Sequence, residues 1–413
     1  MPPKLLEIPV DLVKFGMFVA ALDRPWSETP FMFQGFVLRT ETQLLALKKY
    51  CRKVYVDPVK AERVEAPRIG PSGPPQASAE IAEQLKDKVR GDTAYRASAS
   101  VEAELPRAQT AFEKAGNLLG RLSRTVLTGN VIESERAKEA VTQITDSVVR
   151  NPDAMMLLSQ LREQAAKSLD RALQVSVHMT VFGRFLQLPR DRIELLGLVG
   201  LLQDVGTLKL PAGIAERRSA LTGEALELYK SHITHTVEIL SNTPGLPPEI
   251  LAWASLHHER YDGSGYPRGR KGKAIAQFGS IAAIVDTFDA LTAPPPYGEI
   301  MPPSTALNFL FQHRGTKFHA GLVEQYIQCV GAFPVGSVVE LNTGEVAVVI
   351  AQNLTRRLQP RVMVVEDEDG NPVHPHRMLN LIDEPHASTD EIYRIRRTLE
   401  SDTVRINPRE LFL

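Results

Sequence analysis

The chain has 413 residues, of which 43% are hydrophobic and 23% charged, enough for two or three globular domains with ordinary cores. With 48 Lys and Arg against 49 Asp and Glu, the net charge of −1 provides no overall basic field to attract nucleic acid or an anionic membrane. Two cysteines make no disulfide framework, and with no apparent signal peptide or membrane span we expect a cytoplasmic protein.

The first part of the chain, residues 1–62, is expected to form a small accessory domain of mixed α/β type. Strand patterns occur at 8–10, 16–20 and 54–57, and a helical pattern covers 43–50. These elements are short, so the domain should be small.

A linker and a helical connector follow. Residues 63–80 include four prolines and two glycines with little apolar content, which predicts a linker. Residues 81–153 are rich in Ala, Glu, Lys, Arg and Leu at helical spacing, with helices expected near 106–127 and 131–149. An Asn-Pro-Asp sequence at 151–153 should end the second of these helices and begin the next.

An all-α domain is expected over residues 154–332. The run LLGLVGLL at 195–202 is apolar on all sides, which predicts a buried helix. No strand pattern interrupts this region. The predicted fold class is therefore mainly α, with a small mixed domain in front and a small β-barrel behind.

The predicted β-barrel covers residues 333–386. Strand patterns at 337–341 and 345–350 flank a glycine turn, and a second such pair follows. Residues 387–413 are expected to form a carboxy-terminal helix and tail. The Ser-Thr-Asp-Glu sequence that begins at 388 is an N-terminal helix signal, and it predicts a helix over 388–399.

The most informative stretch is HHERYDGSGYP at residues 257–267. Adjacent histidines cannot share one face of a helix, because each residue turns the helix by about 100°. His257 and His258 can converge on one metal only if the local backbone is held in a special conformation. A turn that is rich in glycine and ends in proline provides such a backbone.

This stretch resembles the signature of the HD-GYP family, metal-dependent phosphodiesterases that open cyclic di-GMP. The resemblance implies that Gly265, Tyr266 and Pro267 form the loop that gives the family its name and that borders the nucleotide site. Residues 24–36 are similar to the accessory domain that often precedes HD-GYP domains in bacteria. Residues 333–385 are similar to the tail found in the same architecture.

The resemblance also implies a metal centre. One family site uses the aspartate of a His-Asp pair and three later histidines, and the matching residues are all present. The final aspartate ligand of the family matches Asp286, which serves the neighbouring site. The implied metal ligands are Asp204, His232, His257, His258 and Asp286, and Asp204 would be catalytic in an active enzyme.

Several positions depart from the family pattern. Arg171 stands where the first histidine belongs, Gln203 replaces the histidine of the His-Asp pair, and Thr207 replaces a lysine that faces the phosphate. The arginines expected soon after the last aspartate are absent from 292–298. Because glutamine is a poor ligand and arginine is none, the resemblance implies one divalent transition metal, with iron or manganese favoured, or none.

Arg171 suggests a second role. We expect it to place a fixed positive charge near Asp204 and Asp286, where it would neutralise carboxylates that repel each other when their metal is absent.

Four further polar residues have simpler interpretations. His235 shares a helix face with His232 and is expected to be an ordinary histidine. His178 would lie about 10 Å along the helix from the first-histidine position, too far to replace that ligand without a shift. Glu259 and Asp262 are expected to hold the loop and to orient histidines.

Two functions follow. The first is a degenerate HD-GYP protein of bacterial cyclic di-GMP signalling, catalytically impaired and acting through protein partners. The alternative is an active metal-dependent cyclic di-GMP phosphodiesterase with a reduced or rearranged metal site. A nucleotide receptor without hydrolysis is a third, and the missing lysine and arginines weaken cyclic di-GMP binding because they would supply the phosphate contacts.

Overall fold

The computed structural model describes most of the chain, in two compact units, Met1–Pro75 and Gln76–Leu413. The predicted linker at 63–80, residues 24–35 and residues 293–298 lie outside the described part. The described residues are 5–23, 36–38, 41–58, 81, 83–85, 87–129, 131–161, 168–211, 213–214, 221–292, 301–353, 356–388 and 391–399.

The first unit is a four-stranded antiparallel sheet with one helix, which confirms the expected mixed α/β type. Its strand order is β1-β4-β2-β3. The core consists of apolar side chains of the strands, the helix and the turns, among them Val19, Leu38, Leu47 and Val54, all fully buried. The elements are β1 (Leu6–Pro9), β2 (Phe18–Leu22), β3 (Phe36–Val37), α1 (Glu41–Tyr50) and β4 (Lys53–Asp57).

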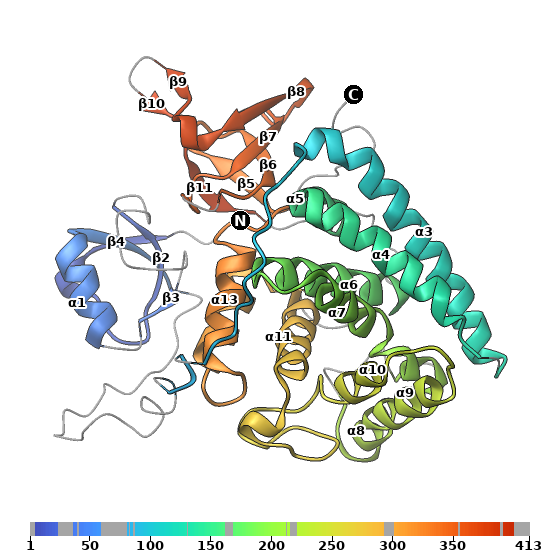
Figure 1. Cartoon of the computed structure of the whole chain (residues 1–413). Helices are drawn as coiled ribbons and strands as arrows, with labels where there is room; N and C mark the ends of the chain where they lie inside the picture. Colours follow the sequence, from blue (N-terminus) through green and yellow to red (C-terminus); the bar gives the residue numbers. More distant parts are fainter. Residues whose placement is uncertain are drawn as a thin grey trace, which may run out of the picture. The chain divides into compact units, whose positions relative to one another are not determined.

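The second unit is mainly helical (Figure 1). The expected all-α character of 154–332 is confirmed for the described residues. The helices are α3 (Val101–Leu127), α4 (Ser134–Arg150), α5 (Pro152–Leu161), α6 (Ser168–Phe185), α7 (Arg190–Leu202), α8 (Gly223–Lys230), α9 (His232–Ser241), α10 (Pro248–Ala254), α11 (Gln277–Thr292), α12 (Pro303–Gln312) and α13 (Ala320–Val330).

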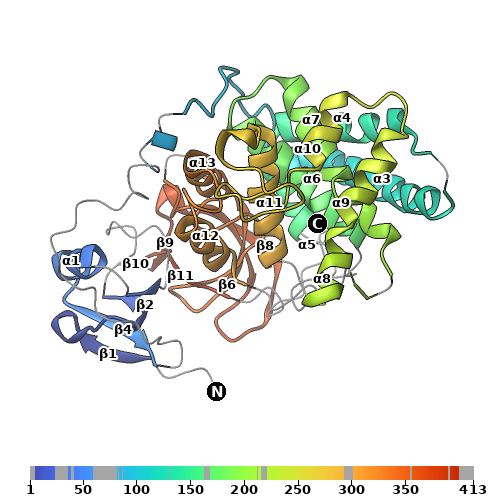
Figure 2. The same ribbon diagram turned by 90° about the horizontal axis from the view of Figure 1, so that it is seen from below.

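Helices α6, α7 and α11 form the centre of this unit. The predicted buried helix at 195–202 lies within α7, and Leu196, Val199 and Leu202 are fully buried. Helix α6 packs against both α7 and α11. Figure 2 shows α11 between α6 on one side and α12 and α13 on the other. These three helices and the ends of their neighbours position the residues of the candidate site.

The predicted connector helices pack directly on this centre. Helix α3 begins after Ser100, whose hydroxyl oxygen accepts a hydrogen bond from the backbone N–H of Ala103 at 3.3 Å. Fully buried Glu104 is bound by two nitrogens of Arg150, both at 2.8 Å, which joins α3 to α4. The expected break at 151–153 is confirmed, because α4 ends at Arg150 and the Asn151 side chain accepts from the Asp153 N–H at 2.9 Å.

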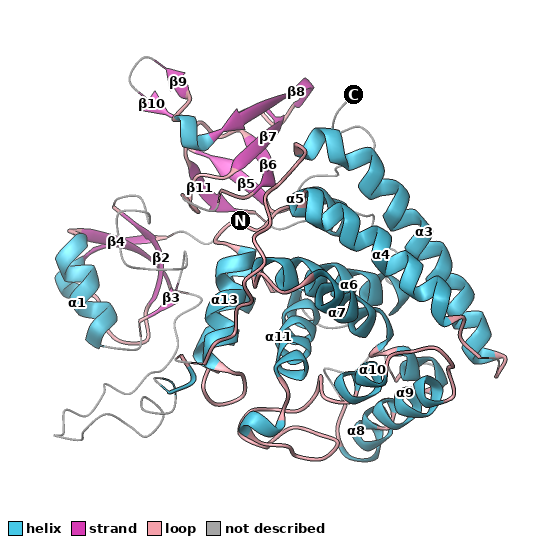
Figure 3. Cartoon of the chain, in the orientation of Figure 1, coloured by secondary structure: helices cyan, strands magenta, loops and turns pink. Residues whose placement is uncertain are grey.

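The carboxy-terminal sheet is antiparallel with the order β11-β5-β6-β7-β8 (Figure 3). Both predicted hairpins are confirmed, β5 with β6 and β7 with β8. Among the described residues β11 and β8 are the two edges, so the sheet is open and the expected closed barrel is corrected. The strands of this sheet are β5 (Val338–Leu341), β6 (Val346–Ala351), β7 (Arg361–Glu366), β8 (Pro372–Asn380) and β11 (Ile395–Thr398). A separate two-stranded sheet consists of β9 (His386–Ser388) and β10 (Glu391–Ile392).

The helix predicted over 388–399 is wrong. The described residues of this stretch form β10 and β11, and β11 adds to the sheet beside β5. Tyr393 is buried in the core of the sheet and Ile395 packs against it. Aromatic and β-branched residues suit a strand, and pairing with β5 outweighs the capping signal.

The sheet is joined to the helices by polar contacts. The backbone N–H of Gln352 donates to the Asp153 carboxylate at the start of α5, at 3.2 Å. Arg361 of β7 lies 2.7 Å from Glu102 of α3. Among the helices that the structure describes, none combines the length and the apolar character needed to cross a bilayer.

Candidate metal centre

The centre is built where α7 ends. Leu202 is the last helical residue of α7, and Gln203 and Asp204 follow before a short 3-10 helix at Val205–Lys209. Because α7 is buried along most of its length, its end carries the Asp204 carboxylate into the interior. The Thr207 hydroxyl donates to the Asp204 backbone carbonyl at 2.6 Å and holds this turn.

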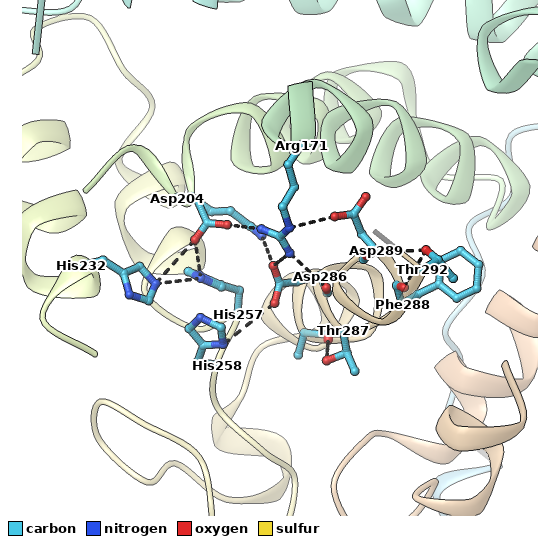
Figure 4. A network of polar contacts seen from close by, with 12 residues as sticks. Arg171, Asp204, His232, His257, His258, Asp286, Thr287, Phe288, Asp289 and Thr292 are labelled. Atoms are coloured by element: carbon cyan, nitrogen blue, oxygen red, sulfur yellow. Dashed lines mark hydrogen bonds and ion pairs between the residues drawn. The ribbon is translucent and has the colours of Figure 1, made fainter. Parts of the chain in front are cut away.

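His232 and His257 each direct the Nε2 atom of the ring towards Asp204. The Nδ1 of His232, at the start of α9, lies 2.6 Å from the Tyr229 carbonyl, and the Nδ1 of His257 lies 2.7 Å from the Ala254 carbonyl. A carbonyl only accepts, so each Nδ1 carries the hydrogen and the neutral ring keeps its lone pair on Nε2. The two Nε2 atoms lie 3.5 and 3.2 Å from Asp204 Oδ1 (Figure 4).

His258 completes a group of four residues that could hold a metal ion. It follows His257 in a non-helical turn after α10, as the sequence requires for neighbouring histidines to converge. One ligand atom each from Asp204, His232, His257 and His258 lies within 4.8 Å of the others. Asp204 Oδ1 and His258 Nε2 are buried without a hydrogen-bond partner.

This arrangement fits a divalent transition metal. Acceptor atoms that face one another without a hydrogen between them are unfavourable when buried. A cation at their centre would satisfy all of them. Histidine nitrogens with one carboxylate oxygen suit transition ions better than calcium or magnesium.

The electrostatics keep Asp204 and His232 in the protonation states that bind metal. Burial by itself would raise the pKa of Asp204, but the neighbouring His257 and Arg171 hold it well below its usual value. Burial lowers the pKa of His232 to about 4, which leaves a neutral imidazole. Burial also lowers the pKa of His257, but Asp204 outweighs it and the net shift is upward. A proton therefore competes with metal for this nitrogen.

Gly206 allows the end of α7 to approach α9. A Cβ at Gly206 would lie 2.1 Å from the His232 carbonyl oxygen and 2.4 Å from the Thr236 nitrogen. The Gly206 N–H donates to the Thr236 hydroxyl at 2.9 Å, and that hydroxyl donates to the Gln203 carbonyl at 3.1 Å. These contacts fix Asp204 relative to His232.

We expect Gly206→Ala to destabilise the helical unit by about 3 kcal/mol, because the added methyl group meets backbone atoms that cannot move cheaply. Urea denaturation followed by circular dichroism measures this. Gly120→Ala is the matched control, since nothing lies within 4 Å of a Cβ at Gly120 in α3 and alanine favours a helix by about 1 kcal/mol. Equal stabilities of the two variants would contradict the close approach.

The loop after the histidines is held by acids, as expected. Glu259 is buried and accepts from the backbone N–H groups of Arg268 and Arg270, each at 2.9 Å. Asp262 accepts from the Ser264 N–H at 2.9 Å. Tyr266 stacks on His258, with ring centroids 4.6 Å apart and planes at 26°. The loop thereby supports the orientation of the His258 ring.

Gly265 makes the loop's closest approach to the histidine segment. A Cβ at Gly265 would lie 2.3 Å from the Arg260 nitrogen and 2.4 Å from the His258 carbonyl oxygen. Only glycine fits there. Pro267 follows Tyr266 and is exposed.

Arg171 lies on the other side of Asp204 and binds three carboxylates (Figure 4). Its Nη1 is 2.5 Å from Asp204 Oδ2 and its Nη2 is 2.5 Å from Asp286 Oδ1. Its Nε is 2.8 Å from Asp289 Oδ2, and the side chain is 6% exposed. The expected contacts with Asp204 and Asp286 are confirmed.

Asp289 was not singled out from the sequence. It lies three residues after Asp286 on α11, so both carboxylates project from one face of that helix. The three-residue spacing was the available sign in the sequence that Asp289 lies beside Asp286. It could not show that both carboxylates contact Arg171.

The other predicted positions lie next to the four ligands. Asp286 is not part of the four-residue group found among the described residues, and its Oδ2 lies 3.9 Å from His258 Nδ1. Fully buried Gln203 directs its Nε2 towards Asp286 Oδ1, at 3.5 Å. Thr207 presents no charge to the centre.

Two other histidines considered from the sequence, His178 and His235, lie apart from the four-residue group. The Nδ1 of buried His178 is 3.1 Å from the Tyr326 hydroxyl, and its Nε2 is 3.3 Å from Gln160. Burial lowers the pKa of His178 to about 4. His235 is half-buried, with its Nδ1 3.8 Å from Glu238. Neither histidine belongs to the four-residue group.

Three family models match successive parts of the chain. Residues 5–137 match a domain of unknown function (DUF3391). Residues 154–322 match the HD domain, which includes all four ligand residues. Residues 338–395 match the KOW domain associated with HD domain.

Curated proteins are similar to most or to part of this chain. The chain is 27% identical to the cyclic di-GMP phosphodiesterase PA4108 of Pseudomonas aeruginosa over 379 residues, which cover 91% of this chain and 89% of that protein. It is 33% identical over 144 residues to the cyclic di-GMP phosphodiesterase response regulator RpfG of Xanthomonas campestris pv. campestris, 35% of this chain and 38% of that one. Among solved structures, an HDG"Y"P protein of Bdellovibrio bacteriovorus, Bd1817, aligns with 78% of this chain and 98% of its own at a TM-score of 0.46 and 15% identity.

Proposed function

We propose that this protein acts in bacterial cyclic di-GMP signalling as a one-metal member of the HD-GYP, cyclic di-GMP phosphodiesterase family. Its HD domain lies between a DUF3391 domain and a KOW domain. Its hydrolytic activity is impaired, and its output passes through protein partners.

The asymmetry of the centre is the observation that carries this proposal. On one side of Asp204, three histidines and one carboxylate oxygen converge, and Asp204 Oδ1 and His258 Nε2 have no hydrogen-bond partner there. On the other side, the second carboxylate oxygen of Asp204 is bound to the guanidinium of Arg171. The first side suits a divalent transition ion, with iron or manganese favoured, and the second side already contains a cation.

The residues define what each side can contribute. A bound metal would polarise a phosphoryl oxygen and lower the pKa of a coordinated water. His232 and His257 hold their Nε2 atoms in place through backbone carbonyls, and Asp204 would be the catalytic carboxylate. Thr207 has a neutral side chain and supplies no positive charge for a phosphate, and its hydroxyl already donates to the Asp204 carbonyl. Phosphate contacts are therefore fewer, which supports impaired hydrolysis and weakened cyclic di-GMP binding.

We propose the following domain limits. The division of the chain between Pro75 and Gln76 falls inside the proposed linker, and the α4–α5 junction supports a start of the HD domain at 154. Neither Cys51 nor Cys329 forms a disulfide, and we propose a cytoplasmic location. The limits are 1–62 for the accessory domain, 63–80 for the linker, 81–153 for the helical connector, 154–332 for the HD-GYP-like domain, and 333–386 for the carboxy-terminal sheet.

An active phosphodiesterase with a reduced site is the second candidate. The preorganised ligand set favours it, because both histidine rings are already fixed by backbone carbonyls. The near full-length relative from Pseudomonas aeruginosa also carries the name of a cyclic di-GMP phosphodiesterase.

Hydrolysis of cyclic di-GMP separates the two candidates. The full chain would be purified without oxygen, supplied with iron or manganese, and assayed for turnover, with nucleotide binding measured calorimetrically on the same sample. We expect turnover to be slow or absent. Fast turnover that is lost in His257→Ala and kept in His235→Ala would identify an active enzyme. Tight binding without turnover would identify a nucleotide receptor.

A further inference from the structure

We propose that the guanidinium of Arg171 takes the place of a second cation in this centre, so that the protein binds a single divalent ion. Removing the guanidinium then lets a second divalent ion bind among Asp204, Asp286 and Asp289. This inference rests on the proposed function for the first ion, at the three histidines.

The contacts of Arg171 resemble those of a metal ion more than those of a simple ion pair. Each of its three nitrogens faces a different carboxylate, at 2.5, 2.5 and 2.8 Å. The carboxylates come from two separate elements, the end of α7 and the middle of α11. Arg171 itself belongs to α6, so one cation joins the three central helices through charge. The Nη2 also lies 3.2 Å from the Asp286 backbone carbonyl.

Asp204 divides its oxygens between two cation positions. Its Oδ2 is bound to Arg171, and its Oδ1 faces the Nε2 atoms of His232 and His257. A carboxylate that bridges two metal ions has this arrangement. Here one of the two partners is a guanidinium.

The charges balance with one divalent ion. Three carboxylates contribute three negative charges and Arg171 contributes one positive charge, which leaves two negative charges. With neutral imidazoles, one divalent ion brings the cluster to neutrality. A second divalent ion beside Arg171 would leave two excess positive charges in a buried site, which is strongly unfavourable.

Gln203 is consistent with this arrangement. Its amide nitrogen lies 3.5 Å from Asp286 Oδ1, the oxygen that Arg171 also contacts. An amide N–H directed at this carboxylate supplements the guanidinium and competes with metal coordination. Arg171 and Gln203 thus both present hydrogen-bond donors at a place where a metal ion would need electron-pair ligands.

Metal stoichiometry tests the proposal directly. Wild type, Arg171→Met and Arg171→His would be produced in manganese-supplemented medium, and bound manganese would be measured by mass spectrometry together with thermal unfolding before and after chelation. We expect one ion per wild-type chain and two per chain in both variants. Chelation should lower the unfolding temperature of the variants more than that of wild type, because three unneutralised carboxylates then remain.

Arg150→Met is the matched control. It breaks the buried Arg150–Glu104 pair between α3 and α4, away from the centre, and should cost stability without changing the metal content. A single ion in Arg171→Met and Arg171→His, with wild-type sensitivity to chelation, would overturn the proposal. Failure of both variants to fold in the presence of manganese would also overturn it, since a divalent ion could then not replace the guanidinium. A wild type that binds no ion would instead refute the proposed function.

Discussion

His257→Ala is expected to weaken metal binding by at least about 100-fold. His257 Nε2 is 3.2 Å from Asp204 Oδ1 and the side chain is fully buried. Loss of residues that merely orient a metal ligand already costs about 10- to 100-fold in affinity, so loss of a ligand should cost at least as much. Titration of the metal-free protein with manganese, followed calorimetrically, measures the change.

His235→Ala is the control for this substitution. His235 is on α9, three residues after His232, but its ring lies 3.8 Å from Glu238 and outside the ligand group. Its replacement should leave metal affinity within about twofold of wild type, because surface substitutions of this kind seldom have large effects. Equal losses in the two variants would show that the four-residue group is not the metal site.

The double replacement Arg171→His with Gln203→His is expected to raise cyclic di-GMP hydrolysis by about 100-fold or more. The two histidines would supply ligands beside Asp286 and remove the cation that occupies this side of Asp204. A second metal ion could then stabilise the leaving or the attacking oxygen, and one positioned electrostatic group contributes about 10²–10³ in rate. Steady-state turnover with manganese measures the gain.

The same double replacement in a His257→Ala background isolates the cause of any gain. That triple variant should show no increase, because the first metal site is lost. Unchanged hydrolysis in the double variant, at two bound ions per chain, would show that these two residues are not what limits activity. The missing phosphate contacts at Thr207 would then be the next candidates.

The four-residue group could be anticipated from the sequence through the resemblance to the HD-GYP family, because two stretches carry that resemblance clearly. The HHERYDGSGYP string is contiguous, and the buried α7 run fixes the register of Asp204. The structure adds what spacing cannot provide, namely that both Nδ1 atoms are bound to backbone carbonyls. The contact of Arg171 with Asp286 was also anticipated, because Arg171 stands at the position of the family's first histidine, which serves the same site as Asp286.

Other features depended on tertiary contacts that no local pattern encodes. Asp289 was missed because its role comes only from Arg171, more than one hundred residues earlier in the chain. The predicted terminal helix failed because β11 gains its stability from pairing with β5. The barrel was not distinguished from an open sheet for the same reason. Strand patterns predict hairpins, whereas closure depends on whether the two edge strands meet.

Manganese stoichiometry and electron paramagnetic resonance of the wild-type protein test the central claim most directly. A mononuclear centre beside a guanidinium predicts one ion per chain and the six-line spectrum of an isolated Mn²⁺ ion. Two ions per chain with the spectrum of a coupled pair would contradict it, because Arg171 would then have to leave Asp204 and Asp286 for the second ion to bind.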